Sequence, residues 1–266
     1  MKQYISHVKF LIVALLFIAL TFLPLFASAD TLDAFAREDG IFENLTAFYL
    51  FLTSVVFAIA FFRFRKSSWL LRLSFAGLAL LFFMGAGEEI SWGERIFDWD
   101  DKNYIRGINV QGELTLHNLK YFQGEDSILP VSISQLFILF VFGFAVLIPV
   151  VCLLFPKIER LVAPHFPVLP WVPGLLVVVT YVFQKLMLRI LPMFPALYQH
   201  PTMPIPQGVH EIREHGYTFA VLASAVLYVL AKSRNTQPEV SREVQVNMNS
   251  PAAGIPLSAK SAGDKS

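Results

Sequence analysis

Three short polar clusters hold the residues of this sequence that could do chemistry. The first runs from Gly87 to Arg95 and contains the adjacent carboxylates Glu88 and Glu89, followed by Trp92. If a helix continues through this stretch, one of its faces carries Glu88, Ser91, Trp92 and Arg95. Carboxylates near a membrane are costly to bury, so this pair needs a cation, a metal ion or a water-filled cavity. The structural alternative is that Glu88 pairs with Arg95 while Trp92 anchors the interface.

The second and third clusters each place a glutamate four residues before a histidine. Glu113 precedes His117 in one cluster and Glu211 precedes His215 in the other, where His210 and Glu214 repeat the spacing. A helix brings residues four apart side by side. Carboxylate and imidazole groups suit zinc, iron or manganese, so these residues form a candidate site for a divalent metal. The candidate ligands are Glu88, Glu113, His117, Glu211 and His215.

Catalytic and substrate-binding roles follow from the same clusters. Glu88, Glu113 and His117 are the candidate catalytic residues, because carboxylates and imidazoles can act as general acids and bases. The candidate substrate-binding residues are Trp92, Arg95, Lys185 and Arg213, and the cations of the last three could bind a phosphate head group. The alternative is that the Glu-x-x-x-His pairs only cap helices and hold loops. The separation of His210 and His215 by five residues is not the zinc spacing of a metalloprotease helix.

Long apolar runs must position these clusters. The chain is 55% hydrophobic with a mean hydropathy of +0.57, and only 15% of its residues are charged, against about 25% in a soluble domain. A span needs about 20 apolar residues, which must form a helix in lipid. We therefore predict an all-α, polytopic transmembrane helix bundle. The expected spans are residues 8–26, 45–62, 69–84, 134–155, 171–191 and 217–231.

The first apolar run has two interpretations. Lys2 and Lys9 flank its start, and Ala27-Ser28-Ala29 before Asp30 is typical of a signal-peptidase site. The run is therefore either an uncleaved first span or a cleaved signal peptide, which gives about six spans or five. Both interpretations leave Asp30 outside the cell.

Lys and Arg in the short loops indicate the orientation, because they accumulate on the cytoplasmic side. They fall on one side of alternating spans, at Lys2, Lys9, Arg63, Arg65, Lys66, Lys157, Arg160, Lys232 and Arg234. The predicted bundle covers residues 1–231 and includes a long extracytoplasmic loop at 85–133. Residues 232–266 have no apolar period, so we predict a disordered cytoplasmic tail. The predicted location is a bacterial inner membrane, with all three polar clusters at its outer face.

Other features narrow the possible functions. The net charge of +1 gives no sign of nucleic-acid binding. Cys152 lies within an apolar run and is typical of a small buried hydrophobe. Glu43, which precedes the second span, falls near the layer of Glu88, and we interpret its stretch as a helix start with capping residues.

The stretch Gly87 to Arg95, followed by Asn109, Gln111, Glu113 and His117-Asn118, resembles a pattern in uncharacterised bacterial multi-pass membrane proteins. The resemblance extends from the second span through the long outer loop. The family motif reads Gly-Glu-Glu-Ile-Ser-Trp-Gly-x-Arg and has Gln where this chain has Glu94, which puts a functional role for Glu94 in doubt. The resemblance implies a membrane location and no particular reaction.

Three functions remain open from the sequence. The first is a membrane-embedded hydrolase or transferase that acts on a lipid or lipid-linked substrate at the extracytoplasmic face. The second is a non-catalytic assembly or partner-binding subunit, in which the clusters brace the outer loop. The third is a small transporter, which mid-span ionisable residues would favour and which the nearly uncharged second, fourth and sixth spans disfavour. The expected partners are the bilayer and a lipid substrate, and the oligomeric state is left open.

Overall fold

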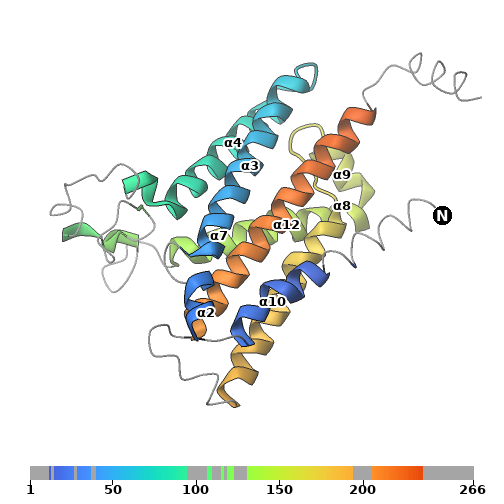
Figure 1. Cartoon of the computed structure of the whole chain (residues 1–266). Helices are drawn as coiled ribbons and strands as arrows, with labels where there is room; N and C mark the ends of the chain where they lie inside the picture. The colour runs from blue at the N-terminus through green and yellow to red at the C-terminus, as the bar shows by residue number, and fades with distance from the viewer. Residues whose placement is uncertain are drawn as a thin grey trace, which may run out of the picture. The chain divides into compact units, whose positions relative to one another are not determined.

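The structure is a computed structural model, shown in Figure 1. It describes residues 12, 15–26, 29–36, 40–94, 107–109, 115–116, 119–122, 131–193 and 205–235. The chain divides into two compact units, residues 1–229 and 230–266. The described residues are mainly helical, and their only β pairing is an isolated bridge between Asn109 and Leu119.

Five stretches of the described residues are long and apolar enough to cross a membrane. They are α3 (Ile41–Arg63), α4 (Trp69–Glu89), the run α7 (Ile133–Phe142), η4 (Gly143–Leu147) and α8 (Ile148–Leu154), α10 (Trp171–Ile190) and α12 (Ile205–Asn235). Each stretch has at least 20 residues, enough for a hydrocarbon core of about 30 Å. The predicted all-α bundle is therefore confirmed for these five runs.

The first apolar run is described only in part. Residues 15–21 are helical and lead into the 3-10 turn η1 (Leu23–Phe26), which is followed by α2 (Ala29–Ala36). The predicted span at residues 8–26 therefore stays a prediction, as does the total span count. Most of the outer loop at 85–133 and nearly all of the tail at 232–266 lie outside the described residues.

Side-chain caps fix the starts of α4 and α7. The Ser68 hydroxyl accepts a hydrogen bond from the Leu71 backbone N–H, which pairs one of the free donors of the first turn of α4. At α7, Ser132 and Gln135 form a reciprocal capping box. Shorter elements join the long ones: η2 (Ser91–Gly93), η3 (Lys120–Phe122), α9 (Pro156–Val162) and η5 (Leu191–Met193).

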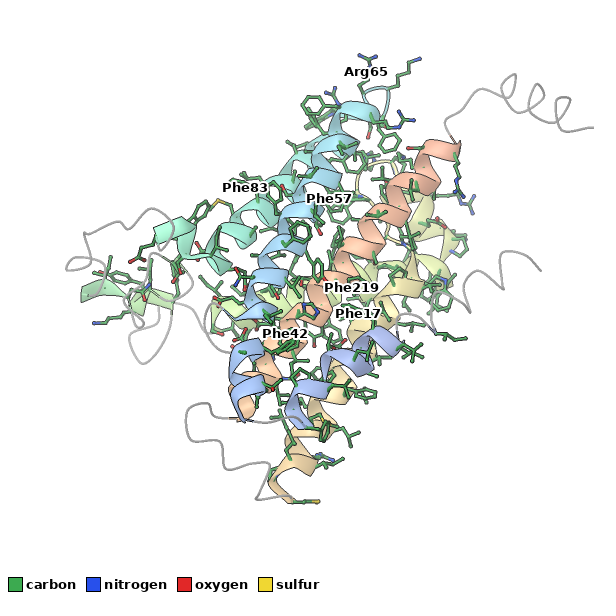
Figure 2. The ribbon with its side chains drawn as sticks, in the orientation of Figure 1. Phe17, Phe42, Phe57, Arg65, Phe83 and Phe219 are labelled. Atoms are coloured by element: carbon green, nitrogen blue, oxygen red, sulfur yellow. The ribbon has the colours of Figure 1, made fainter. Side chains whose placement is uncertain are left out.

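Helices α3 and α4 pack side by side as an antiparallel pair, as Figure 1 shows. The Ser54 hydroxyl of α3 donates a 2.7 Å hydrogen bond to the Ala79 carbonyl of α4. Phe57, which is fully buried, stacks on Phe75 and Phe82 of the other helix. The turn between the two helices carries Arg65, whose side chain points away from the helices in Figure 2.

Helix α12 contacts four of the other elements. His215 packs against Phe42 of α3, Tyr217 against Phe142 of α7, and Tyr228 against Phe75 of α4. A Cβ at Gly216 would come within 3 Å of the Thr180 side chain, so α10 also approaches α12 closely. In Figure 2, Phe17 and Phe42 lie near Phe219, which belongs to this helix. The buried side chains of α12 therefore pack against the other long helices.

The junction between α7 and α8 is a π-helical segment, η4. Pro149 in the first turn of α8 has no N–H to pair with the carbonyl four residues earlier, and its ring crowds that carbonyl. This carbonyl belongs to Ala145, and Gly174 of α10 lies directly against it, so a Cβ there would overlap the oxygen. The absence of a side chain at Gly174 therefore allows the α10 backbone to approach the Ala145 carbonyl closely.

Candidate functional site

A cavity of about 420 Å³ lies mainly between α4 and α7. We call it the α4–α7 pocket. Its walls are apolar and include Leu81, Phe82, Leu136, Phe137 and Phe140. Pockets for small ligands usually measure about 300–1,000 Å³ and have mostly apolar walls with a few polar groups. The size and lining of this cavity are therefore those of a ligand site.

The polar groups of the pocket lie at one end of the helices. Glu88 and Glu89 come from the last turn of α4, and Glu214 comes from the early part of α12. Glu89 also interacts electrostatically with Glu43 of α3 and with Glu211. Three helices therefore bring five carboxylates together at this end of the bundle. We call these five residues the carboxylate cluster.

Glu88 is held by two hydrogen bonds. Its Oε1 accepts a 2.6 Å bond from the Trp92 indole N–H, and its Oε2 accepts a 2.6 Å bond from the Leu116 backbone N–H. The indole ring packs over Gly87, where a Cβ would stand 2.8 Å from ring atoms. We call this arrangement of Gly87, Glu88, Trp92 and Leu116 the Glu88 clasp. It fastens the loop residue Leu116 to the end of α4.

The single helical face that would carry Glu88, Ser91 and Trp92 does not form. The helix ends at Glu89, and Ser91, Trp92 and Gly93 have positive φ angles of 47°, 52° and 74°. Such left-handed backbone costs a residue with a side chain about 1–2 kcal/mol, so the turn needs support from its surroundings. The turn still directs Trp92 back to Glu88, and there the Glu88 clasp supplies that support.

His215 has a mainly aromatic environment. Its ring centroid lies 5.6 Å from that of Phe17, 5.0 Å from Phe42 and 5.3 Å from Tyr49. The side chain is 1% exposed, and Nδ1 has no hydrogen-bond partner among the described residues. The surroundings favour packing over the predicted metal-ligand role.

The metal hypothesis gains no support from the part of the chain that the structure describes. No group of three or more His, Cys, Asp and Glu side chains in it is arranged to hold a metal ion. Two of the five candidate ligands, Glu113 and His117, lie outside the described residues, and so does the binding candidate Arg95. Their catalytic, binding and metal roles stay predictions.

The remaining binding candidates lie on three different elements. Arg213 donates through Nη2 to Glu214 Oε1 at 2.6 Å, next to the carboxylate cluster. Lys185 lies on α10, with its ammonium 5.4 Å from the Tyr181 ring centroid. Trp92 lines a second apolar hollow between α3 and α4, of about 430 Å³, with Phe48 and Phe83. Only Glu214 of the Arg213–Glu214 pair lines the α4–α7 pocket.

Of the two adjacent glutamates, the sequence singles out Glu88 as a candidate, whereas in the structure Glu89 interacts with the other members of the carboxylate cluster. A signal for this was available in the sequence. The buried side chains of α4 recur at Leu71, Phe75, Leu78, Phe82 and Ala86. One further step of three residues reaches Glu89, so this carboxylate continues the interior face of the helix. Glu43, interpreted as part of a helix start, belongs to the same carboxylate cluster.

Comparison with known proteins adds no family. No protein-family model matches the chain, and neither the curated proteins nor the solved structures contain a significant match. The function is therefore inferred from the chemistry of the site.

Proposed function

We propose that the protein is a multi-pass protein of a bacterial inner membrane that binds a lipid or lipid-linked substrate in the α4–α7 pocket. It acts there as a hydrolase or transferase on the substrate head group. The observation that carries this proposal is a cavity with apolar walls and Glu88, Glu89 and Glu214 at one end. An amphiphilic ligand matches both parts, because its chain suits the walls and its head group reaches the carboxylates.

The distribution of basic residues supports an extracytoplasmic location for the carboxylate cluster. Arg63, Arg65 and Lys66 lie where α3 passes into α4, and Lys157 and Arg160 lie on α9. These positions are at the helix ends away from Glu43, Glu88 and Glu89. By the positive-inside rule, the basic ends face the cytoplasm. The carboxylate cluster then faces outward, and α12 ends on the cytoplasmic side.

Glu89 is the best-placed general base. It lines the pocket, whereas both oxygens of Glu88 are engaged in the Glu88 clasp. In the proposed reaction Glu89 takes the proton of a water or alcohol whose oxygen attacks the carbonyl carbon or phosphorus of the substrate ester. The bond to the leaving oxygen then breaks, and Glu89 returns the proton to that oxygen. This role for positioned carboxylates contributes about 10²–10⁴-fold to a rate.

The first test addresses binding. Leu136 lines the pocket, while Leu139, one turn further along α7, is exposed and does not line it. We expect Leu136→Trp to fill the pocket and to prevent labelling of α4 and α7 by a photo-crosslinkable fatty-acyl phospholipid in vesicles. Leu139→Trp is the matched control and should label like the native protein. Equal labelling of both variants would contradict the proposed binding site.

The second test addresses chemistry. Glu89→Gln is compared with Glu159→Gln, which changes an exposed carboxylate on α9. Mass spectrometry follows lipid products in vesicles of phosphatidylethanolamine and phosphatidylglycerol that contain each variant. We expect Glu89→Gln to lower product formation about 100-fold or more at normal protein level. Unchanged turnover in Glu89→Gln would remove Glu89 from the mechanism.

One observation favours the non-catalytic alternative. The Glu88 clasp braces Leu116 of the outer loop against α4, which is what an assembly or partner-binding subunit would need for a stable outer surface. In that function Glu89→Gln leaves the cellular phenotype intact, whereas Glu88→Gln reduces the amount of protein in the membrane. Quantifying protein level beside phenotype separates the two proposals.

A further inference from the structure

Five buried polar atoms on α10 and α12 have no hydrogen-bond partner among the described residues. One is His215 Nδ1, whose ring lies among the aromatic side chains described above, and the other four are Thr180 Oγ1, Gln184 Oε1, Arg213 Nε and the Tyr217 hydroxyl. These four residues are at most 8% exposed. Buried polar groups are nearly always paired, and an unpaired one in a membrane interior is especially costly. The four atoms together indicate a polar ligand at the interface of the two helices.

The two helices bring these groups into one neighbourhood. Thr180 lies against Gly216, where a Cβ would stand 2.9 Å from its hydroxyl oxygen. Gln184 follows Thr180 by one turn on α10, and Arg213 precedes Gly216 by about one turn on α12. Since successive spans run antiparallel, these two residues approach each other. Phe142 of α7 closes one side, because its ring meets the Tyr217 ring edge-on.

All four groups can donate a hydrogen bond. The Arg213 Nε–H is only a donor, and the hydroxyls of Thr180 and Tyr217 can rotate to donate. The Gln184 atom without a partner is Oε1, an acceptor, and rotation of the amide by half a turn would place its NH₂ donors there. Converging donors match a ligand whose oxygens are acceptors.

Charges of both signs lie near this site. Lys185 and Arg213 both interact electrostatically with His210, and the Arg213 guanidinium lies 6.0 Å from the Tyr217 ring centroid. The acidic neighbours on α12 are Glu214, which accepts a hydrogen bond from Arg213 Nη2, and Glu211. The Nε of the same guanidinium has no hydrogen-bond partner among the described residues. This donor and the two cations can attract an anion on the side away from the carboxylate cluster.

We infer that the α10–α12 interface binds a phosphate-type oxyanion, held by Arg213 with Gln184, Tyr217 and Thr180 and drawn in by Lys185. Arginine and lysine are the usual partners of phosphate oxygens, and such bonds are stronger than neutral ones. The oxyanion belongs either to a phospholipid head group or to free phosphate. The inference does not rest on the proposed chemistry of the α4–α7 pocket, whose lining includes none of these four residues.

The test measures phosphate-dependent binding to the full chain in detergent. Native mass spectrometry counts bound phosphatidylglycerol and, in a second arm, diacylglycerol, which has the same chains without phosphate. In a third arm inorganic phosphate competes with phosphatidylglycerol. Competition at millimolar phosphate assigns the site to free phosphate, and its failure assigns the site to the lipid head group.

Two variants and one control locate the site. Tyr217→Phe keeps the buried ring and removes only the hydroxyl, and Lys185→Gln changes an exposed side chain, so both should fold. We expect each to weaken phosphatidylglycerol binding about tenfold, the effect of losing one charge-assisted hydrogen bond. Arg189→Gln removes a positive charge from the last turn of α10 and should change binding less than twofold.

Three results would overturn the inference. One is equal binding of diacylglycerol and phosphatidylglycerol, which would make the phosphate irrelevant. Another is an equal loss in Lys185→Gln and Arg189→Gln, which would indicate unspecific attraction to positive charge. The third is unchanged binding in Tyr217→Phe, in which case buried water is the partner of these groups. The variant Leu136→Trp should leave this phosphate binding intact, which keeps the test separate from that of the α4–α7 pocket.

Discussion

The close packing of Trp92 on Gly87 predicts that a single methyl group will break the Glu88 clasp. In Gly87→Ala the new Cβ would stand 2.8–2.9 Å from three atoms of the indole ring. Real Cβ atoms do not approach ring atoms this closely, so the ring must move. The same substitution at Gly77, also on α4, meets nothing within 4 Å. Gly77→Ala is therefore a matched control in the same helix.

The magnitude follows from separate contributions to the free energy of unfolding. Replacing glycine by alanine within a helix stabilises by about 0.5–1 kcal/mol, and Gly77→Ala should show this gain alone. Overpacking in Gly87→Ala costs about 1–3 kcal/mol. If the ring moves far enough to release Glu88, the lost bond to a carboxylate costs about 1.5–3 kcal/mol more. Comparing the two variants cancels the helix contribution, so Gly87→Ala should be less stable by about 1–6 kcal/mol.

The assay is unfolding in mixed micelles, followed by circular dichroism, for the native protein and both alanine variants. A double-mutant cycle with Trp92→Ala identifies the cause. Once the indole is removed, adding Gly87→Ala should cost nothing further. Equal stability of Gly77→Ala and Gly87→Ala, or a full loss that persists without the Trp92 ring, would refute the packing argument.

Three further predictions concern other parts of the structure. Gly174→Ala should destabilise by about 1–3 kcal/mol in the same unfolding assay, because its Cβ would overlap the Ala145 backbone carbonyl, which cannot rotate aside. His215→Phe should retain or raise the free energy of unfolding, because it keeps the contacts with Phe17, Phe42 and Tyr49 and removes a buried Nδ1 that has no partner among the described residues. A decrease of more than about 1 kcal/mol in the free energy of unfolding would mean that this nitrogen is hydrogen-bonded. Glu88→Gln should lower stability by about 1–3 kcal/mol and leave the metal content of the purified protein unchanged, because both carboxylate oxygens already accept hydrogen bonds; loss of a stoichiometric metal would restore Glu88 as a ligand.

The apolar runs predicted five of the helices well, because a segment that spans lipid must pair its own backbone polar groups and a helix does this within one segment. The interior face of α4 was also readable, since Leu71, Phe75 and Phe82 continue to Glu89 at helical spacing. The end of α4 could not be predicted from the sequence. The helix ends before the left-handed turn at 91–93, which is stabilised by contacts that Trp92 makes in the folded chain.

The composition of the candidate site depended on tertiary contacts that spacing does not encode. Residues four apart on a helix are neighbours, yet His215 turns toward aromatic rings of other elements. Glu43 and Glu214 meet Glu89 only because α3, α4 and α12 bring their ends together. The sequence singled out Glu88 at this end of the bundle, and the structure adds Glu89 to the lining of the α4–α7 pocket.

The length of α12 ties the carboxylate cluster to the thickness of the bilayer. The stretch of α12 that is long and apolar enough to cross a membrane has 27 residues and measures about 40 Å, whereas a typical hydrocarbon core is about 30 Å thick. The helix must therefore tilt or extend beyond the core. The turn that holds Glu211 and Glu214 is at the end that this mismatch moves. A thinner membrane would bring these carboxylates toward water, and a thicker one would draw them toward the acyl chains. The length of the lipid acyl chains would therefore change how far these carboxylates are exposed to water.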